Sequence, residues 1–331
     1  MRLARPLTFL AAIAACTLGA LAQPKEPTTQ PATPPGGIKV DAKLAEYKPA
    51  QGVSGTIKSI GSDTMNNLMA HWGDEFKKFY PSVKIEIEAK GSGTAPPALI
   101  AGQSQFGPMS RPMSAKEIDE FEKAFGYKPT QLRTAIDTIG IFVNKDNPLT
   151  EITLEQAKKV FSVAGPNMTW GDLGVKDAKL AGQPIILYGR NSASGTYTYF
   201  KEHALGKTDY KASVKEQPGS SAVVQAVGSD PAGMGYSGIG YQTADVKMLK
   251  IKTPEGQSVE GTYETALNGE YPLARFLYLY VNKKPDESLD PVRGEFIKMV
   301  FSKAGQESVI KDGYFPVPAA IASEDLKKAG F

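Results

Sequence analysis

The chain repeats a strand, a short turn of glycine and serine, and a helix, and this order constrains its fold more than any other feature. "GTIKSI" at 55–60 has the composition of a strand, "GSDT" follows at 61–64, and hydrophobic residues then recur at helical spacing up to Pro81. A second unit joins the alternating strand "VKIEIEA" to the turn "GSGT" and a helix that begins near Pro96. Strands alternating with helices predict an α/β fold with a largely parallel sheet.

Two further units follow the same order. "FGPMSR" precedes a helix to about Phe125, for which Ser114 and Glu117 form a capping box, and "GRNSASGT" at 189–196 follows the buried strand "PIILYG" and precedes another helix. Because ligands of such sheets bind at the carboxyl ends of strands, we expect all four turns at that edge. Thr153 is expected to cap a further helix between the third and fourth units. Later in the chain, "RFLYLYVN" predicts a strand and "FIKMVF" predicts a helix.

The first residues predict export. Residues 1–22 combine basic residues, an apolar stretch and a final Ala-Leu-Ala, which is the pattern of a signal peptide and implies a periplasmic or extracellular location. Cys16 is the only cysteine and lies in "IAAC", which is similar to the lipobox of bacterial lipoproteins, so a lipid anchor through Cys16 is the alternative. Residues 23–54 begin with a run of proline, threonine and glutamine and are expected to form a Pro-rich linker or tether.

Charge argues against a nucleic-acid partner. Without Arg2 and Arg5 of the expected signal peptide, the chain holds 36 basic and 35 acidic residues, a net charge of +1. So small a net charge does not predict binding to nucleic acid or to an acidic membrane surface. A charged ligand would therefore have to be bound by charged or polar residues close to its site.

The sequence lacks the residues that several kinds of active site require. "LGKT" at 205–208 would end a phosphate-binding P-loop, but the required earlier glycine is Lys201, and "GMGYSG" at 233–238 is not followed by a helical pattern. The only histidines, His71 and His203, lie in separate predicted helices, so a serine nucleophile has no evident base. No cluster of cysteine and histidine predicts a metal site, and we expect no cofactor.

The four turns together favour an anion site. The start of a helix offers free N–H groups and partial positive charge, and glycine and serine allow close approach and add hydroxyl donors. Arg111 and Arg190 add a planar fork that can grip two oxygens. One such turn alone is more often an ordinary helix cap. Four in one chain, two of them with an arginine, favour binding of an oxyanion.

These segments resemble the phosphate-binding proteins of Pst-type ABC transporters, within the periplasmic binding protein superfamily. The resemblance rests on "GSDTMNNLMAHWGDEFKKFYP", "GSGT", "FGPMSRPM", "AIDTIGIFVNKDNPLTEITLEQAKKVFS", "GRNSASGTYTYFKEH", "DPAGMGYSGIGY" and "GYFPVP", in family order. It implies a type II fold whose ligand cleft lies between two α/β domains joined by a hinge that the chain crosses twice. Domain I is expected at 55–135 plus 276–331, and domain II at 136–275.

The resemblance also implies the site and the function. A monomer with no enzymatic activity would bind inorganic phosphate and deliver it to the permease subunits of an ABC transporter. The family's loops map onto Ser62, Asp63, Thr64, Ser92, Ser110, Arg111, Arg190, Ser194, Gly195 and Thr196.

Two positions depart from well-known members. Ser110 stands where those members have an aspartate that accepts the proton of phosphate, and Ala193 stands where many have glycine. Asp63 is the first candidate to replace that aspartate, and Asp137 is the second.

Three other functions stay open on the sequence alone. The same pocket suits another oxyanion such as sulfate, molybdate or tungstate. It also suits a phosphatase-like enzyme, for which Ser194 would be tested as the nucleophile. A matrix or adhesion protein could use the fold without transport.

Overall fold

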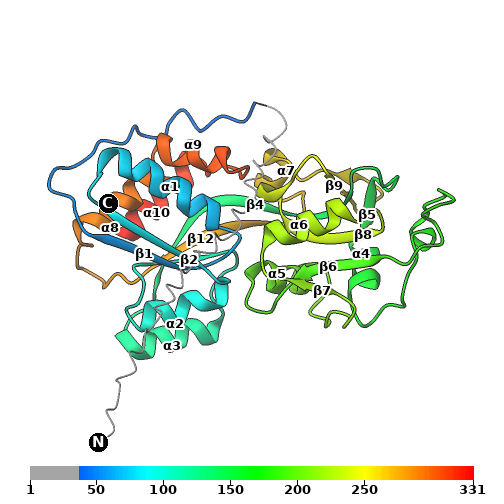
Figure 1. Ribbon diagram of the computed structural model, residues 1–331. Coiled ribbons are helices and arrows are strands. Elements are labelled where there is room, and N and C mark those ends of the chain that lie inside the picture. Colours follow the sequence, from blue (N-terminus) through cyan, green and yellow to red (C-terminus); the bar gives the residue numbers. More distant parts are fainter. Residues whose placement is uncertain (1–36) are drawn as a thin grey trace, which may run out of the picture. The chain divides into compact units, whose positions relative to one another are not determined.

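The computed structural model describes residues 37–331, and a nine-stranded mixed sheet organises its backbone (Figure 1). The expected signal peptide, Cys16 and the first part of the expected linker lie outside the described residues. The strands are β1 (Thr56–Gly61), β2 (Lys84–Ala89), β3 (Phe106–Met109), β4 (Thr130–Asn144), β5 (Glu151–Thr153), β6 (Ile186–Arg190), β7 (Lys215–Gln217), β8 (Gly233–Gly238), β9 (Val246–Met248), β10 (Lys250–Lys252), β11 (Ser258–Val259) and β12 (Ala274–Val281).

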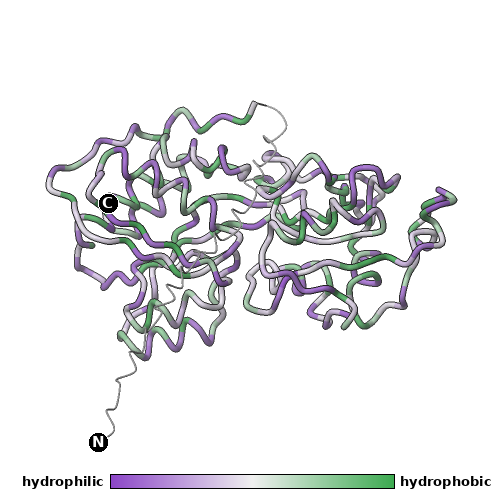
Figure 2. Tube along the Cα trace, in the orientation of Figure 1, coloured by the Kyte–Doolittle hydropathy of each residue, from purple (hydrophilic) through white to green (hydrophobic). Residues whose placement is uncertain are grey.

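Ten α-helices and three short 3₁₀ turns connect these strands within residues 37–331. They are α1 (Asn66–Phe79), η1 (Ser92–Thr94), α2 (Ala95–Ile100), α3 (Ala115–Phe125), α4 (Leu154–Phe161), η2 (Gly171–Leu173), α5 (Gly195–His203), α6 (Ser220–Ser229), η3 (Ile239–Tyr241), α7 (Tyr263–Leu267), α8 (Pro291–Val300), α9 (Lys303–Lys311) and α10 (Ala319–Ala329). Figure 2 shows green and purple stretches alternating along the chain, as expected for elements with one buried face. In this part of the chain, every helix is too short or too polar to cross a membrane.

The sheet is mixed, so the prediction of a largely parallel sheet is wrong at its centre. The strand order is β2-β1-β3-β12-β4-β8-β6-β7, with β9 also paired to β4. β1 pairs in parallel with β2 and β3, and β6 with β7 and β8, but β12 runs antiparallel to β3 and β4, and β4 antiparallel to β8. The long strand β4 pairs with β12 through its first part and with β8 through its second part. One continuous strand therefore joins the two parallel sets.

The predicted helix starts are confirmed where the signal is local. Ser114 and Glu117 form the expected capping box of α3, and Thr153 and Gln156 form that of α4. In each box the side chain of the first residue accepts from a backbone N–H that the helix leaves unpaired. Because these bonds span only three residues, they need no information from the rest of the chain.

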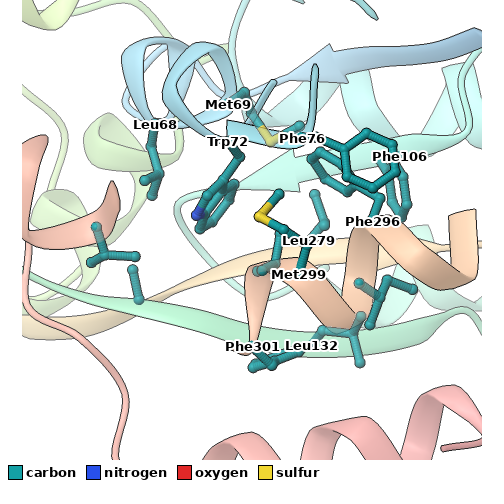
Figure 3. Packing of buried hydrophobic residues seen from close by; sticks show 14 of the residues in the cluster. Leu68, Met69, Trp72, Phe76, Phe106, Leu132, Leu279, Phe296, Met299 and Phe301 are labelled. Carbon is teal, nitrogen blue, oxygen red and sulfur yellow. The ribbon is translucent and has the colours of Figure 1, made fainter. Parts of the chain in front are cut away.

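The first core cluster lies between α1, α8 and the strands β3, β4 and β12 (Figure 3). The Phe296 ring packs edge-on to Phe76 at a centroid distance of 5.3 Å and against Phe106 at 5.1 Å. Trp72 is buried, and its indole N–H donates to the Gly305 carbonyl over 2.8 Å, which joins α1 to α9. Apolar burial of this kind is the main source of stability for the sheet edge that carries the first loops.

A second core cluster lies under β6 and β8. Phe200 of α5 and Tyr236 of β8 stack with centroids 4.1 Å apart, and Phe161 packs edge-on to both. The Tyr236 hydroxyl also accepts from the backbone N–H of Arg190 over 3.2 Å. This stack therefore fixes the end of β6 and the start of the loop that follows it.

The packed part of the chain begins earlier than the expected boundary at residue 55. Residues 37–54 form no regular element, but Leu44 is buried in the first cluster, and the Tyr47 hydroxyl donates to the Glu295 carboxylate of α8 over 2.7 Å. The sequence carries no periodic pattern in this segment, so its contacts depend on partners far away in the chain. The domain boundaries at 135/136 and 275/276 stay a prediction.

Phe76→Ala should lower the free energy of unfolding by about 3–5 kcal/mol, because it removes a large ring from a close-packed core. Lys77→Ala, at the exposed neighbouring position of α1, is the matched control and should change it by less than about 0.5 kcal/mol. Urea unfolding followed by circular dichroism measures both. Equal effects of the two substitutions would contradict the packing described.

Candidate anion-binding site

Four loops at the carboxyl ends of strands lie in direct contact. They are loop 1 (62–64) after β1, loop 2 (91–94) after β2, loop 3 (110–111) after β3 and loop 4 (190–196) at the end of β6. The hydroxyls of Thr64 in loop 1 and Thr196 in loop 4 lie 2.9 Å apart, and those of Ser92 in loop 2 and Ser110 in loop 3 lie 3.2 Å apart. The edge predicted for the four turns therefore exists, and it brings nine of the ten predicted residues together.

The side chains of this loop cluster are withdrawn from water. Seven of them are at most 2% exposed: Ser62, Thr64, Ser92, Ser110, Arg190, Ser194 and Thr196. Buried polar groups are normally hydrogen-bonded, because water no longer satisfies them. Nine buried side-chain atoms in the described residues have no hydrogen-bond partner, and three of them belong to the four loops: Ser62 Oγ, Arg111 Nε and Arg190 Nε. The arginine nitrogens can only donate and the serine hydroxyl can donate its hydrogen, which suits an anion.

The N-terminus of α5 points its first N–H groups at the cluster. Ser194 is the N-cap, and its hydroxyl accepts from the N–H groups of Thr196 and Tyr197. Gly195 is the first helical residue, so its N–H has no partner within the helix. A Cβ at Gly195 would lie 2.4 Å from Ser92 Oγ and 2.5 Å from Ser110 Oγ, so only glycine allows this approach.

Arg190 is held on two sides. Its Nη2 lies 3.0 Å from Asp63 Oδ2 in loop 1, and its Nη1 donates to Ser220 Oγ over 2.6 Å. Its side chain is 1% exposed, so the guanidinium has been taken out of water and is fixed by these partners. The remaining donor, Nε, is the unpartnered atom described above.

Asp63 acts as the missing cap of another helix. α6 begins at Ser220, and its N-cap Gly219 has no side chain to bond the free N–H groups. Asp63 Oδ2 accepts from the Ser220 N–H over 2.8 Å, while the Tyr241 hydroxyl donates to the Asp63 carbonyl over 2.9 Å. None of the hydrogen bonds recorded for this carboxylate uses Oδ1, so one acceptor oxygen remains.

Arg275 is a buried residue of the site that sequence reasoning missed. Its Nε and Nη2 donate to Asp137 Oδ2 over 3.0 and 2.8 Å, and Asp137 lies directly opposite it in the β12–β4 ladder. Nη2 also donates to Thr196 Oγ1 over 2.8 Å, and Nη1 donates to the Ser110 carbonyl over 2.7 Å. One side chain therefore contacts both loop 3 and loop 4.

A signal for Arg275 exists in the sequence. In "ARFLYLYV" the buried positions of β12 alternate through Arg275, Leu277 and Leu279, so the arginine stands on the apolar face of its strand. A charge in that position requires a buried partner. The sequence alone does not say which residue supplies it.

Asp137 is fully buried as the partner of Arg275. Burial raises the pKa of the Asp137 carboxyl, and the Arg275 guanidinium acts in the opposite direction. Its second oxygen, Oδ1, accepts from the backbone N–H of Ile239 over 3.1 Å. Both oxygens are thus engaged within the protein, in contrast to Asp63.

The Arg111 guanidinium bonds outside the cluster. It forms two hydrogen bonds of 2.7 Å with the Glu117 carboxylate of α3 and a third, from Nη1, with the Pro112 carbonyl. Burial acts to raise the pKa of Glu117, but the hydrogen bonds from Arg111 and Ser114 outweigh it and the pKa is lowered. The expected grip of Arg111 on a ligand stays a prediction that no recorded contact supports. Within residues 37–331, no group of acidic, cysteine or histidine side chains is arranged to hold a metal ion.

Known proteins share this architecture. The model of the PBP superfamily domain matches residues 47–304. A phosphate-binding protein PstS from Pseudomonas aeruginosa is 51% identical over 298 residues, which cover 88% of this chain and 92% of the relative. A crystal structure from Clostridium perfringens with bound phosphate, assigned to a phosphate ABC transporter substrate-binding protein, superposes with a TM-score of 0.67 at 25% identity and covers 80% of this chain and 100% of its own.

A more distant likeness supports the fold alone. An ABC-type phosphate transport receptor from Vibrio cholerae has a TM-score of 0.62 at 20% identity and covers 79% of this chain and 100% of its own. The matched domain and the close relative together cover the strands that carry all four loops. The chain therefore has the α/β fold of type II periplasmic binding proteins and belongs to the PBP superfamily and, within it, to the family of PstS phosphate-binding proteins.

Proposed function

We propose that this protein binds inorganic phosphate at the loop cluster and delivers it to an ABC permease, without chemical turnover. One observation carries the proposal: Arg190 Nε in loop 4 and Ser62 Oγ in loop 1 are buried without partners, and the N–H of Gly195 in loop 4 has no partner within α5. An oxyanion satisfies all three donors at once. The named relatives support phosphate as that anion.

Because the charges in the loop cluster are paired, an anion there would be bound mainly by neutral dipolar groups. Arg190 is paired with Asp63, and Arg275 is paired with Asp137, so the two buried cations are each balanced by a carboxylate. An incoming anion is then stabilised by hydroxyl groups, N–H groups and the positive end of α5. Such fixed donors replace the water that the anion gives up on entry.

The remaining oxygen of Asp63 provides a way to tell phosphate from sulfate. At neutral pH, phosphate carries at least one proton that it can donate, whereas sulfate carries none. Asp63 Oδ1 is an acceptor on the same carboxylate that pairs with Arg190, and both oxygens of Asp137 are already engaged. These contacts favour Asp63 over Asp137 as the acceptor that replaces the family's aspartate at position 110.

The hydroxyl of Ser194 is arranged for capping and not for attack. It accepts from two N–H groups of its own helix. His203 stacks on Tyr199 with ring centroids 3.9 Å apart, and the His71 ring lies 3.7 Å from Asp312, so neither histidine bonds to Ser194. A nucleophilic serine needs a base within hydrogen-bonding distance, and this geometry favours a binding protein over a phosphatase.

Transport requires the site to open and close. β4 and β12 are the two strands that pass through the expected boundary between domain I and domain II, and they pair with each other across it. Bending of these two strands would separate loops 1, 2 and 3 from loop 4. We further propose that the protein is exported, acts as a monomer, and presents its closed form to the permease subunits.

Arg190→Met should weaken phosphate binding at least 100-fold, because it removes charge-assisted hydrogen bonds worth about 1.5–3 kcal/mol each. Isothermal titration calorimetry with inorganic phosphate measures the Kd. Arg293→Met is the control, since Arg293 pairs with Asp290 at the start of α8 and contacts no loop of the cluster. Unchanged affinity in the Arg190 variant would remove the loop cluster as the phosphate site.

Asp63→Asn should weaken phosphate binding by about tenfold or more while leaving the affinity for sulfate unchanged or raised. The amide gives the site a donor where the proton of phosphate needs an acceptor, and sulfate has no such proton. Calorimetric competition between the two anions at pH 7 gives the ratio. If the affinities for both anions fall equally, Asp63 does not accept the proton of phosphate.

Salt should change phosphate affinity little, by less than about threefold between 50 and 500 mM NaCl. The paired arginines leave no net side-chain charge to screen, and buried interactions are screened weakly. A series of titrations at constant pH tests this expectation. A loss of more than tenfold would indicate attraction by unpaired surface charge.

A further inference from the structure

Arg275 joins two loops that come from opposite sides of the crossing strands. Its guanidinium donates to the Ser110 carbonyl in loop 3 and to the Thr196 hydroxyl in loop 4, and it is 1% exposed. No other arginine or lysine in residues 37–331 has recorded hydrogen bonds to both of these loops. Asp137 accepts two hydrogen bonds from the guanidinium and so fixes its orientation, which allows it to bond to both loops.

The ion pair lies where the two core clusters meet. Leu273, directly before β12, belongs to the second cluster and Leu277 of β12 to the first, with Arg275 between them. In β4, Ile136 belongs to the first cluster and Ile139 to the second. Movement of one cluster against the other therefore acts on the bonds that Arg275 makes to the two loops.

The direction of these bonds also orients the hydroxyl groups. Because arginine can only donate, Thr196 Oγ1 must accept from Arg275. The hydrogen of Thr196 is then free to donate to Thr64 Oγ1, 2.9 Å away, or to an anion in the cluster. Arg275 thus polarises a chain of hydroxyl groups so that they act as donors.

We propose that Arg275 is a positioning residue for anion binding, which holds loop 3 and loop 4 together and turns the Thr196 and Thr64 hydroxyls into donors. The inference rests on the proposed binding of phosphate at the loop cluster. It assigns the unprotonated oxygens of the ligand to the Thr196 and Thr64 hydroxyls, because a ligand hydroxyl would meet only other donors there. The proton of phosphate is therefore directed to an acceptor elsewhere in the cluster, for which the Asp63 carboxylate in loop 1 is the candidate.

A double-mutant cycle between Arg275→Lys and Thr196→Val tests this role with inorganic phosphate as the probe. Lysine keeps the charge but loses the planar fork that reaches three partners, so we expect phosphate affinity to fall by about 10- to 100-fold. Thr196→Val removes the hydroxyl while keeping the shape of the side chain. If Arg275 acts through Thr196, the double variant loses much less affinity than the product of the two single losses.

Arg133→Lys is the matched control. Arg133 lies on the same strand as Asp137, and its Nε pairs with the buried Asp325 over 3.0 Å, but it contacts none of the four loops. It should bind phosphate as tightly as the unchanged protein. Thr196→Ser, which restores a hydroxyl, should recover most of the affinity that Thr196→Val loses.

Urea unfolding verifies that each variant is folded before titration. If Arg275→Lys does not fold, Asp137→Asn replaces it in the cycle, because it loosens the partner that fixes the guanidinium. Additive losses in the cycle, or an equal loss in Arg133→Lys, would overturn the role of Arg275. If the unchanged protein binds no phosphate, the proposed function fails and this inference fails with it, which is a separate and recognisable result.

Discussion

The buried ion pair between Arg275 and Asp137 is the interaction on which the arrangement of the site depends. Two charges withdrawn from water are costly unless each is paired and hydrogen-bonded, and removal of one partner leaves the other uncompensated. The pair therefore fixes the register of β12 against β4, the two strands that cross between the core clusters. From that fixed point, the same guanidinium holds the Ser110 carbonyl and the Thr196 hydroxyl.

The site around this pair combines strong donors with little net charge. Arg190 and Arg275 are both paired with carboxylates, so under the proposed function the specificity for an anion comes from oriented groups shielded from water. Gly195 allows the start of α5 to approach Ser92 and Ser110 closely. The hydroxyls that Arg275 orients act as donors, whereas Asp63 in loop 1 offers an acceptor oxygen. This asymmetry suits a partly protonated tetrahedral anion.

Sequence reasoning recovered the parts of this site that depend on local chemistry. The glycine-serine turns and the Ser194 cap are visible because each is defined within a few residues, and family resemblance assigned Arg190 and Gly195. Arg275 was missed because its partner lies 138 residues away in the chain, and only the pairing of β12 with β4 brings the two together. Arg111 was predicted to contact the ligand, but its guanidinium bonds to the capping-box residue Glu117, six residues later in the chain.

The most direct test of the central claim is a crystal structure of the protein grown with inorganic phosphate. The account predicts one phosphate in the loop cluster, with oxygens within hydrogen-bonding distance of Arg190 Nε, Ser62 Oγ and the Gly195 N–H. It also predicts that the protonated oxygen faces Asp63 and that Arg275 keeps its bonds to Asp137 and Thr196. Phosphate bound elsewhere, or bound in the cluster without contact to Arg190, would contradict the account.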